Sequence, residues 1–268
     1  MAAGRCEDGD DILTSLNEEI ELAGSGRGRW HAAYVGLAYR SAVEAAMRRV
    51  GRDATRVLKT DLWNECMTGE RDIVNHLMKA AQCRPVAVDV AFSLCVRGRS
   101  MTPGAHVVQA DVRALPFRAG AFDAVLDLST LDHLPEAGAA AAVGEYGRVL
   151  RGGGVLLLVF WQRNLLVRLR LLLKRWLGRR EKPGQQYFRR ADIRSGFGQG
   201  LEIVREFVAG SLLTLPHRMT SAVLGRVPSR VLNPVLGWLV RVGHAPAARG
   251  VLAQIAGLYG IIAVRRDG

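Results

Sequence analysis

The chain has 268 residues and a formal net charge of +12, a length that fits one domain or two. Its residues are 49% hydrophobic and 23% charged, which excludes a largely disordered chain. Residues 1–150 have 17 Lys and Arg against 20 Asp and Glu, a net charge of −3. Residues 151–268 have 20 against 5, a net charge of +15. The second half is therefore expected to meet something anionic: a membrane surface, a nucleic acid or a phosphorylated substrate.

The cysteines exclude two classes of small-domain architecture. No CxxC pair is present and no His stands at metal-ligand spacing, so neither a zinc site nor a disulfide framework is expected. We expect free thiols in a reducing cytoplasm at Cys6, Cys66, Cys83 and Cys95. The acidic N-terminal segment predicts no secretory signal, and no apolar stretch reaches the roughly 18–20 residues of a spanning helix.

The elements expected in chain order begin with an acidic, then Gly- and Arg-rich arm over residues 1–29, with a short helix over 11–22. An amphipathic helix follows over 30–50. Short apolar runs then alternate with helical patterns, which is typical of βαβ units around a parallel sheet. The expected strands are 56–60, 86–90, 106–109, 122–127 and 154–160, with helices over 70–82 and 137–150.

The pattern changes after residue 160. It predicts a basic helix over 164–177, a loop and short helix over 185–195, and a strand over 202–208. Four prolines between residues 212 and 256 predict several short helices there. An apolar strand over 259–265 ends the chain.

Acidic residues stand at the ends of the first four strands. They are Asp61, Asp89, Asp111 and Asp127. Because ligands of an open parallel sheet bind beyond the carboxyl ends of its strands, these carboxylates point to a site that accepts hydrogen bonds from ribose hydroxyls, an adenine amino group and an ammonium. Any one of them could equally be a helix cap or a turn residue. Four at one edge favour a ligand site.

Four segments around these acids resemble the motifs of class I S-adenosylmethionine (SAM)-dependent methyltransferases, in the group called methyltransferase type 11. The segments are 86–91 (VAVDVA), 108–117 (VQADVRALPF), 122–134 (FDAVLDLSTLDHL) and 148–154 (RVLRGGG). The resemblance implies SAM as cofactor, with Asp89 on the ribose, Asp111 and its neighbour Val112 at the adenine, and Asp127 beside the methyl group. It also implies an α/β fold: a Rossmann-like doubly wound, mostly parallel seven-stranded sheet with an N-terminal helical segment and a largely helical insertion before the last strand.

The first motif departs from the family. Lys59 stands where the family has an acidic residue, and a GxGxG loop is missing, since Gly69 is the first glycine after that strand. Two interpretations follow. In one, a modified loop with Thr60, Asp61 and Glu65 still binds the methionyl part of SAM. In the other, the pocket has lost SAM binding and the fold is a scaffold. A SAM-dependent reaction other than methyl transfer is a further alternative.

The sulfonium of SAM is already activated, so methyl transfer requires mainly positioning and desolvation. A base is needed only where the acceptor must lose a proton, and Asp132 and His133 are the nearest candidates. The alternative is that His133 belongs to a structural turn of the family.

The basic helix over 164–177 has two faces on a helical wheel. Asn164, Arg168, Arg175 and Arg179 share one, and the opposite one consists of Leu165, Leu169, Leu172, Leu173 and Trp176. This composition is that of an interfacial membrane helix. It also fits a helix packed on the sheet with a solvated cationic face.

The sequence therefore predicts four parts: an N-terminal arm and helical cap (1–54), a SAM-binding core (55–160), a basic, mainly helical acceptor or lid region (161–257) and a final core strand (258–268). Leu, Val and Arg in the third part favour a small-molecule or lipid-like acceptor with an anionic portion, met in the cytoplasm or at an anionic membrane surface. An RNA acceptor is the alternative, although no nucleic-acid motif is present.

Overall fold

The computed structural model describes residues 29–51, 55–67, 73–80, 83–178, 185–198, 200–210, 227, 229–245 and 256–267. The strands are β1 (Val57–Thr60), β2 (Val86–Asp89), β3 (His106–Gln109), β4 (Phe122–Leu128), β5 (Leu150–Trp161), β6 (Leu201–Gly210) and β7 (Leu258–Arg265). The helices are α2 (Arg29–Val50), α3 (Trp63–Met67), α4 (Ile73–Ala80), α5 (Phe92–Met101), the 3₁₀ turn η2 (Leu131–His133), α6 (Glu136–Val149), α7 (Leu165–Trp176), α8 (Arg190–Ser195) and α10 (Ser229–Gly243).

All seven strands form one sheet in the order β3-β2-β1-β4-β5-β7-β6. β1 pairs in parallel with both β2 and β4, so the chain order reverses direction at β1. β7 is antiparallel to β5 and to β6. This is the expected Rossmann-like, mostly parallel seven-stranded fold. In such a sheet the crevice beside the reversal point, at the carboxyl ends of the strands, is where ligands bind.

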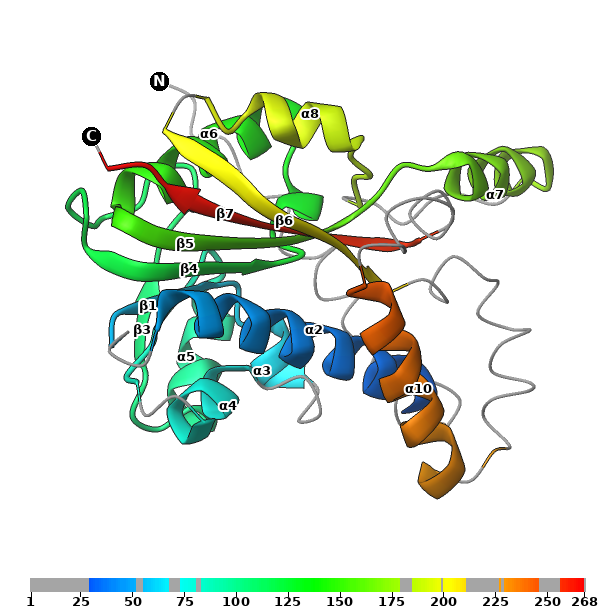
Figure 1. Cartoon of the computed structure of the whole chain (residues 1–268), viewed down its shortest axis with the longest axis horizontal. Helices are drawn as coiled ribbons and strands as arrows, with labels where there is room; N and C mark the ends of the chain where they lie inside the picture. Colours follow the sequence, from blue (N-terminus) through cyan, green and yellow to red (C-terminus); the bar gives the residue numbers. More distant parts are fainter. Residues whose placement is uncertain are drawn as a thin grey trace.

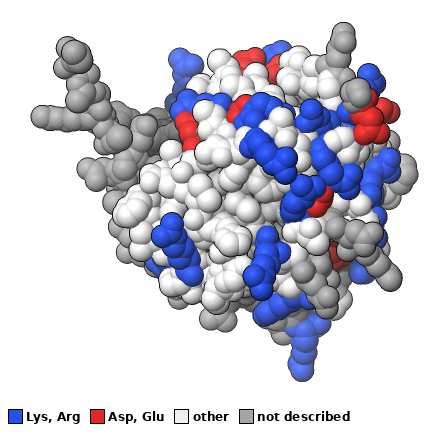
Figure 2. Space-filling view, turned by 90° about the vertical axis from the view of Figure 1, so that its left-hand side faces the viewer, with Lys and Arg blue, Asp and Glu red and all other residues white. Residues whose placement is uncertain are grey.

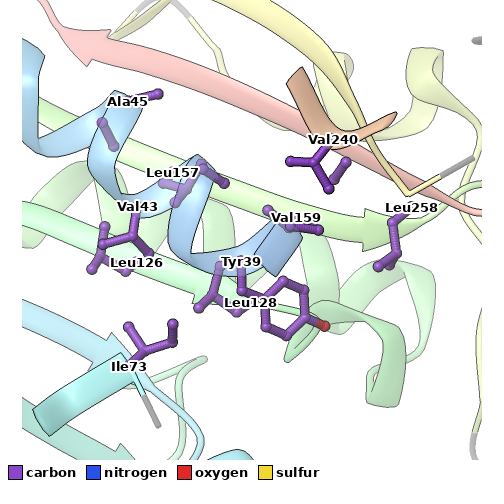
Figure 3. Close-up of a cluster of buried hydrophobic side chains, with 14 of the residues drawn as sticks. Tyr39, Val43, Ala45, Ile73, Leu126, Leu128, Leu157, Val159, Val240 and Leu258 are labelled. Atoms are coloured by element: carbon purple, nitrogen blue, oxygen red, sulfur yellow. The ribbon is translucent and has the colours of Figure 1, made fainter. Parts of the chain in front are cut away.

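Helices cover both faces of the sheet (Figure 1). The central strands alternate their side chains between two apolar clusters, because successive residues of a strand point to opposite faces. Leu126 and Leu157 pack towards α2 and α10, and Val125 and Leu156 pack towards α6 and α8. Figure 3 shows the first of these clusters, where Tyr39 and Val43 of α2 lie over the sheet. Burial on both faces explains why residues 124–126 of β4 and 155–161 of β5 are continuously apolar.

The expected elements agree with the structure except at three places. The short helices α3 and α5 lie in segments for which no helix is expected from the sequence. The prediction that prolines divide residues 212–256 into short helices is wrong over residues 229–243, where one 15-residue helix contains Pro234. Leu232, Leu236 and Val240 of this helix are buried, and their packing offsets the hydrogen bond that proline cannot donate. The arm and helix expected over residues 1–28 lie outside the described residues.

The end of the sheet where the parallel strands begin is basic (Figure 2). Arg56 and Arg151 both pair with Asp123, at 2.8 and 2.7 Å. Burial raises the pKa of the Asp123 carboxyl, but the hydrogen bonds from the two arginines outweigh it and bring the pKa to about 2. This basic surface lies at the opposite end of the strands from the crevice.

Packing at the centre of β7 requires a glycine. A Cβ built on Gly260 would overlap the ring of Phe207, which is fully buried in the neighbouring strand β6. Gly260→Ala is therefore expected to lower the free energy of unfolding by about 1–3 kcal/mol through overpacking. Urea denaturation measures this value.

Gly144 provides the matched control, because a Cβ there meets nothing within 4 Å and the residue lies exposed inside α6. Gly144→Ala is expected to raise the free energy of unfolding by about 0.5–1 kcal/mol, since alanine loses less backbone entropy in a helix. Equal effects of the two substitutions would contradict the packing described here.

Candidate functional site

A buried lysine organises the loop that follows β1. Lys59 is fully buried, and its Nζ lies 3.0 Å from Glu65 Oε2 and 3.3 Å from Asp61 Oδ2. The same amine donates a hydrogen bond to the carbonyl oxygen of Asp61 at 2.6 Å. Glu65 Oε1 accepts a second hydrogen bond, from the amide of Ile73 at the start of α4. One cation thus links β1, α3 and, through Glu65, α4.

The charges in this cluster depend on one another. Burial alone lowers the pKa of the Lys59 amine, but the carboxylates of Asp61 and Glu65 reverse this effect and leave the pKa above its ordinary value. Burial raises the pKa of Glu65, and the charge of Lys59 offsets only part of that rise. Removal of Lys59 would leave the buried carboxylate of Glu65 without a cation.

Asp61 is the member of the cluster that reaches the surface, with 18% of its side chain exposed. Its φ of 55° is left-handed, a conformation that glycine adopts without strain and that Asp tolerates better than most residues. Asp61 Oδ1 accepts the amide of Trp63 at 3.0 Å, and Oδ2 accepts the hydroxyl of Thr130 at 3.3 Å. The loop after β1 therefore turns through an Asp in a left-handed conformation, held by two hydrogen bonds to its carboxylate.

Asp89, the last residue of β2, joins the same edge. Its Oδ2 accepts the amide of Leu62, and its Oδ1 accepts the amide of Ala91, both at 2.8 Å. Each carboxylate oxygen keeps a second lone pair. Val90 and Phe92, directly after Asp89, are exposed apolar side chains at this end of the strand. An acceptor of hydrogen bonds and an apolar surface thus lie together beside β2.

Asp127, at the end of β4, is fully buried. Its Oδ1 accepts the amide of Thr130 at 2.9 Å and its Oδ2 accepts the hydroxyl of Tyr146 at 2.7 Å. Burial raises the pKa of Asp127 to about 7, although both hydrogen bonds act in the opposite direction. The hydroxyls of Thr60 and Thr130 lie 2.6 Å apart, which connects the ends of β1 and β4.

Asp111 and Val112, both expected at the cofactor, are engaged elsewhere. The carboxylate of Asp111 accepts hydrogen bonds from the guanidinium of Arg113, the shortest at 2.5 Å, and this pairing lowers its pKa. Val112 is buried in the cluster under α6. The structure therefore brings Thr60, Asp61, Glu65, Asp89 and Asp127 to connected strand ends, whereas Asp111 is paired with a neighbour in its own loop.

The two residues considered as bases differ in exposure. Asp132 is fully buried; its Oδ1 accepts the amide of Trp161 at 2.9 Å and its Oδ2 has no hydrogen-bond partner. Burial raises its pKa well above the usual range. Asp132 thus connects η2 to the end of β5. The side chain of His133 is exposed.

The pairing of Lys59 with Glu65 was not anticipated, nor were the contacts of Thr130 and Tyr146. A lysine inside an apolar strand, with acids two and six residues later, is the signal that could have indicated it. Nothing local in the sequence indicates Tyr146, because its partner lies 19 residues away. Among the described residues no group of His, Cys, Asp and Glu could hold a metal ion, and Cys66, Cys83 and Cys95 are buried free thiols.

The fold is that of class I methyltransferases, and part of the chain matches a family model. Residues 66–158 match the family model described as a methyltransferase domain. The match confirms the resemblance seen in the sequence. It begins after β1 and the loop around Lys59, which is the segment that departs from the family motif. No curated protein matches the sequence.

Solved structures show the same fold at low sequence identity. The methyltransferase in the complex with the Haloferax volcanii Trm112 methyltransferase activator is 16% identical, with 99% of this chain and 100% of that chain covered and a TM-score of 0.59. Geranyl diphosphate methyltransferase in complex with SAM is 14% identical, with 85% of each chain covered and a TM-score of 0.53. The [4+2]-cyclase SpnF is 18% identical, with 85% and 81% covered and a TM-score of 0.53.

The Lys59 cluster is open to a double-mutant test. Lys59→Met is expected to lower the free energy of unfolding by about 3–5 kcal/mol, because Glu65 is left buried without its cation. Adding Glu65→Gln removes that charge and is expected to restore more than half of the loss. Urea denaturation of the two single variants and the double variant measures both values; a double variant no more stable than Lys59→Met would refute the pairing.

The raised pKa of Asp127 predicts a pH dependence. The folded protein keeps a proton that the unfolded chain releases, so the wild type loses stability as the pH rises from about 4 to about 7. Asp127→Asn does not titrate, so its stability relative to the wild type is expected to rise over this range by up to roughly 4 kcal/mol. Unfolding at about pH 4 and about pH 8 measures the difference, and equal differences at both pH values would show an ordinary carboxyl.

Proposed function

We propose that the protein is a SAM-dependent methyltransferase for an amphipathic small-molecule or lipid-like acceptor with an anionic portion. The observation that supports this best is the joining of three strand ends: Asp61 contacts Thr130, and Asp89 accepts the amide of Leu62. These contacts gather carboxylates from β1, β2 and β4 at the edge where the fold binds ligands.

The described residues suit the groups that SAM presents. In the proposal the partly exposed carboxylate of Asp61 takes the ammonium, and Asp89 uses its remaining lone pairs for the ribose hydroxyls. The exposed side chains of Val90 and Phe92 offer an apolar surface to the adenine. Asp111 reaches the adenine amino group only by sharing its carboxylate with Arg113.

SAM, when bound, supplies an activated methyl group. The protein then has to orient the acceptor and exclude water. No strong base is required of the chain unless the acceptor must lose a proton, and Asp132 is fully buried, with its pKa raised by that burial. The exposed His133 is the residue proposed for that role.

The acceptor is proposed from the composition of the region after β5. Residues 151–268 have a net charge of +15 and are rich in Leu and Val. Such a region suits an acceptor with an apolar body and an anionic group. Geranyl diphosphate methyltransferase, a protein of the same fold, is named for an acceptor of that kind.

A second candidate function follows from Lys59. Its ammonium already contacts the carbonyl oxygen and the carboxylate of Asp61, the group proposed to take the ammonium of SAM. In this interpretation the chain supplies its own cation and the domain is a scaffold that binds no SAM. A third is suggested by SpnF, a protein of this fold that is named as a [4+2]-cyclase.

Calorimetry with SAM and S-adenosylhomocysteine separates these candidates. Both ligands are expected to bind, and Asp89→Asn is expected to weaken binding about 10- to 100-fold, through loss of hydrogen bonds to a charged group. Asp192→Asn is the matched control, because Asp192 also accepts a backbone amide but belongs to α8; it is expected to bind normally.

Absence of binding by the folded wild type would overturn the proposal and favour the scaffold. Binding without transfer of the methyl group to any member of a panel of amphipathic acceptors, followed with radiolabelled SAM, would instead favour chemistry other than methylation.

A further inference from the structure

Helix α7 lies apart from the body of the protein. Figure 1 shows it extending from the carboxyl end of β5, clear of the sheet. Val167 is its one buried residue. The N-cap Asn164 accepts the amide of Val167 at 2.8 Å and donates to the carbonyl of Ala256, so the first turn is attached to the body. Beyond that turn, Arg170 contacts Tyr187 at 3.0 Å.

The apolar face of α7 points outward. Trp176 is 82% exposed, Leu165 62% and Leu172 61%; Leu169, Leu173 and, directly after the helix, Leu177 are also exposed. The alternative that these residues pack on the sheet is therefore wrong. So large an apolar surface on one short helix marks a binding surface.

The charge of α7 identifies the partner. The helix has four basic residues, Arg168, Arg170, Lys174 and Arg175, and no acidic residue. Arg168 and Arg175 are exposed. A second copy of this chain would bring the same positive charge to the contact, which disfavours self-association. A nucleic acid would match the charge but not the leucines. An anionic lipid bilayer offers both headgroup charge and an apolar layer.

Helix α10 also has exposed apolar side chains. Leu232, Leu236 and Val240 pack inward, while Val231, Val235 and Trp238 are exposed. These three lie at i, i+4 and i+7, which is one face of a helix. The helix has Arg230 and Arg241 and no acidic residue. Figure 1 shows α7 and α10 both towards the end of the sheet where β4 and β5 finish.

We propose that the exposed faces of α7 and α10 dock on an anionic lipid bilayer and lie in its interface. Among the described residues, no helix is long and apolar enough to cross a membrane. Because α7 directly follows β5, docking places the carboxyl edge of the sheet near the lipid. The docking itself does not depend on the proposed methyl transfer.

Flotation of the full chain with vesicles tests the proposal. The wild type is expected to float with vesicles of phosphatidylcholine and phosphatidylglycerol at low salt, less so at high salt, and weakly with phosphatidylcholine alone. Arg168→Gln/Arg175→Gln is expected to weaken binding roughly 30-fold, at about fivefold for each charge. Leu169→Gln/Leu172→Gln/Trp176→Gln is expected to weaken it roughly 100-fold or more.

The matched control is Arg48→Gln/Arg49→Gln, which removes the same charge from exposed positions in the last turn of α2. It is expected to float nearly as well as the wild type. Failure of the wild type to float with anionic vesicles would overturn the proposal, as would equal losses in the α7 charge variant and the α2 control. Retention of the protein on RNA without flotation would also overturn the docking proposal.

Calorimetry of the same variants with SAM, in the absence of vesicles, keeps the two proposals separate. Loss of flotation with normal SAM binding would contradict only the docking proposal. Normal flotation without SAM binding would contradict only the proposed function.

Discussion

The interaction of Lys59 with Asp61 and Glu65 is the constraint on which the rest of the site depends. A lysine amine buried at the end of a central strand is stable only beside compensating carboxylates, and the loop after β1 supplies two of them. Their attraction folds the loop back on the strand. Asp61 then takes a left-handed conformation, and the amide of Leu62 reaches Asp89. The positions of Asp61 and Glu65 thus depend on one buried cation.

The same cluster explains how the chain dispenses with a glycine-rich loop. Glycines normally allow a loop to turn sharply after a strand. Here an Asp makes the turn, and hydrogen bonds from Trp63 and Thr130 to its carboxylate hold it. The site is more crowded as a result, because Lys59 contacts the carboxylate of Asp61, which the ammonium of a ligand would also use. The two candidate functions, cofactor binding and scaffold, differ in whether Asp61 has capacity for a second cation.

The two ends of the parallel strands differ in charge and in exposed apolar surface. The end where the parallel strands begin is basic and its pairs centre on Asp123 (Figure 2). The other end has the carboxylates of the site and, directly after β5, the exposed face of α7. Asp132 connects η2, which follows β4, to the end of β5, because its carboxyl accepts the amide of Trp161. The strand-end carboxylates and the exposed face of α7 therefore share one edge of the sheet.

The sequence by itself determined the class of fold and the strand-end acids. Apolar runs of β4 and β5 require burial on both faces, and short motifs place Asp89 and Asp127 at strand ends; both follow from neighbours along the chain. Only the tertiary structure decided that Lys59 pairs with Glu65, that Arg113 engages Asp111, that Pro234 lies within a helix and that the leucines of α7 face outward. The sequence pattern indicates which residues prefer burial or hydrogen bonds. Which side chains then become interaction partners depends on the segments that the folded sheet brings together.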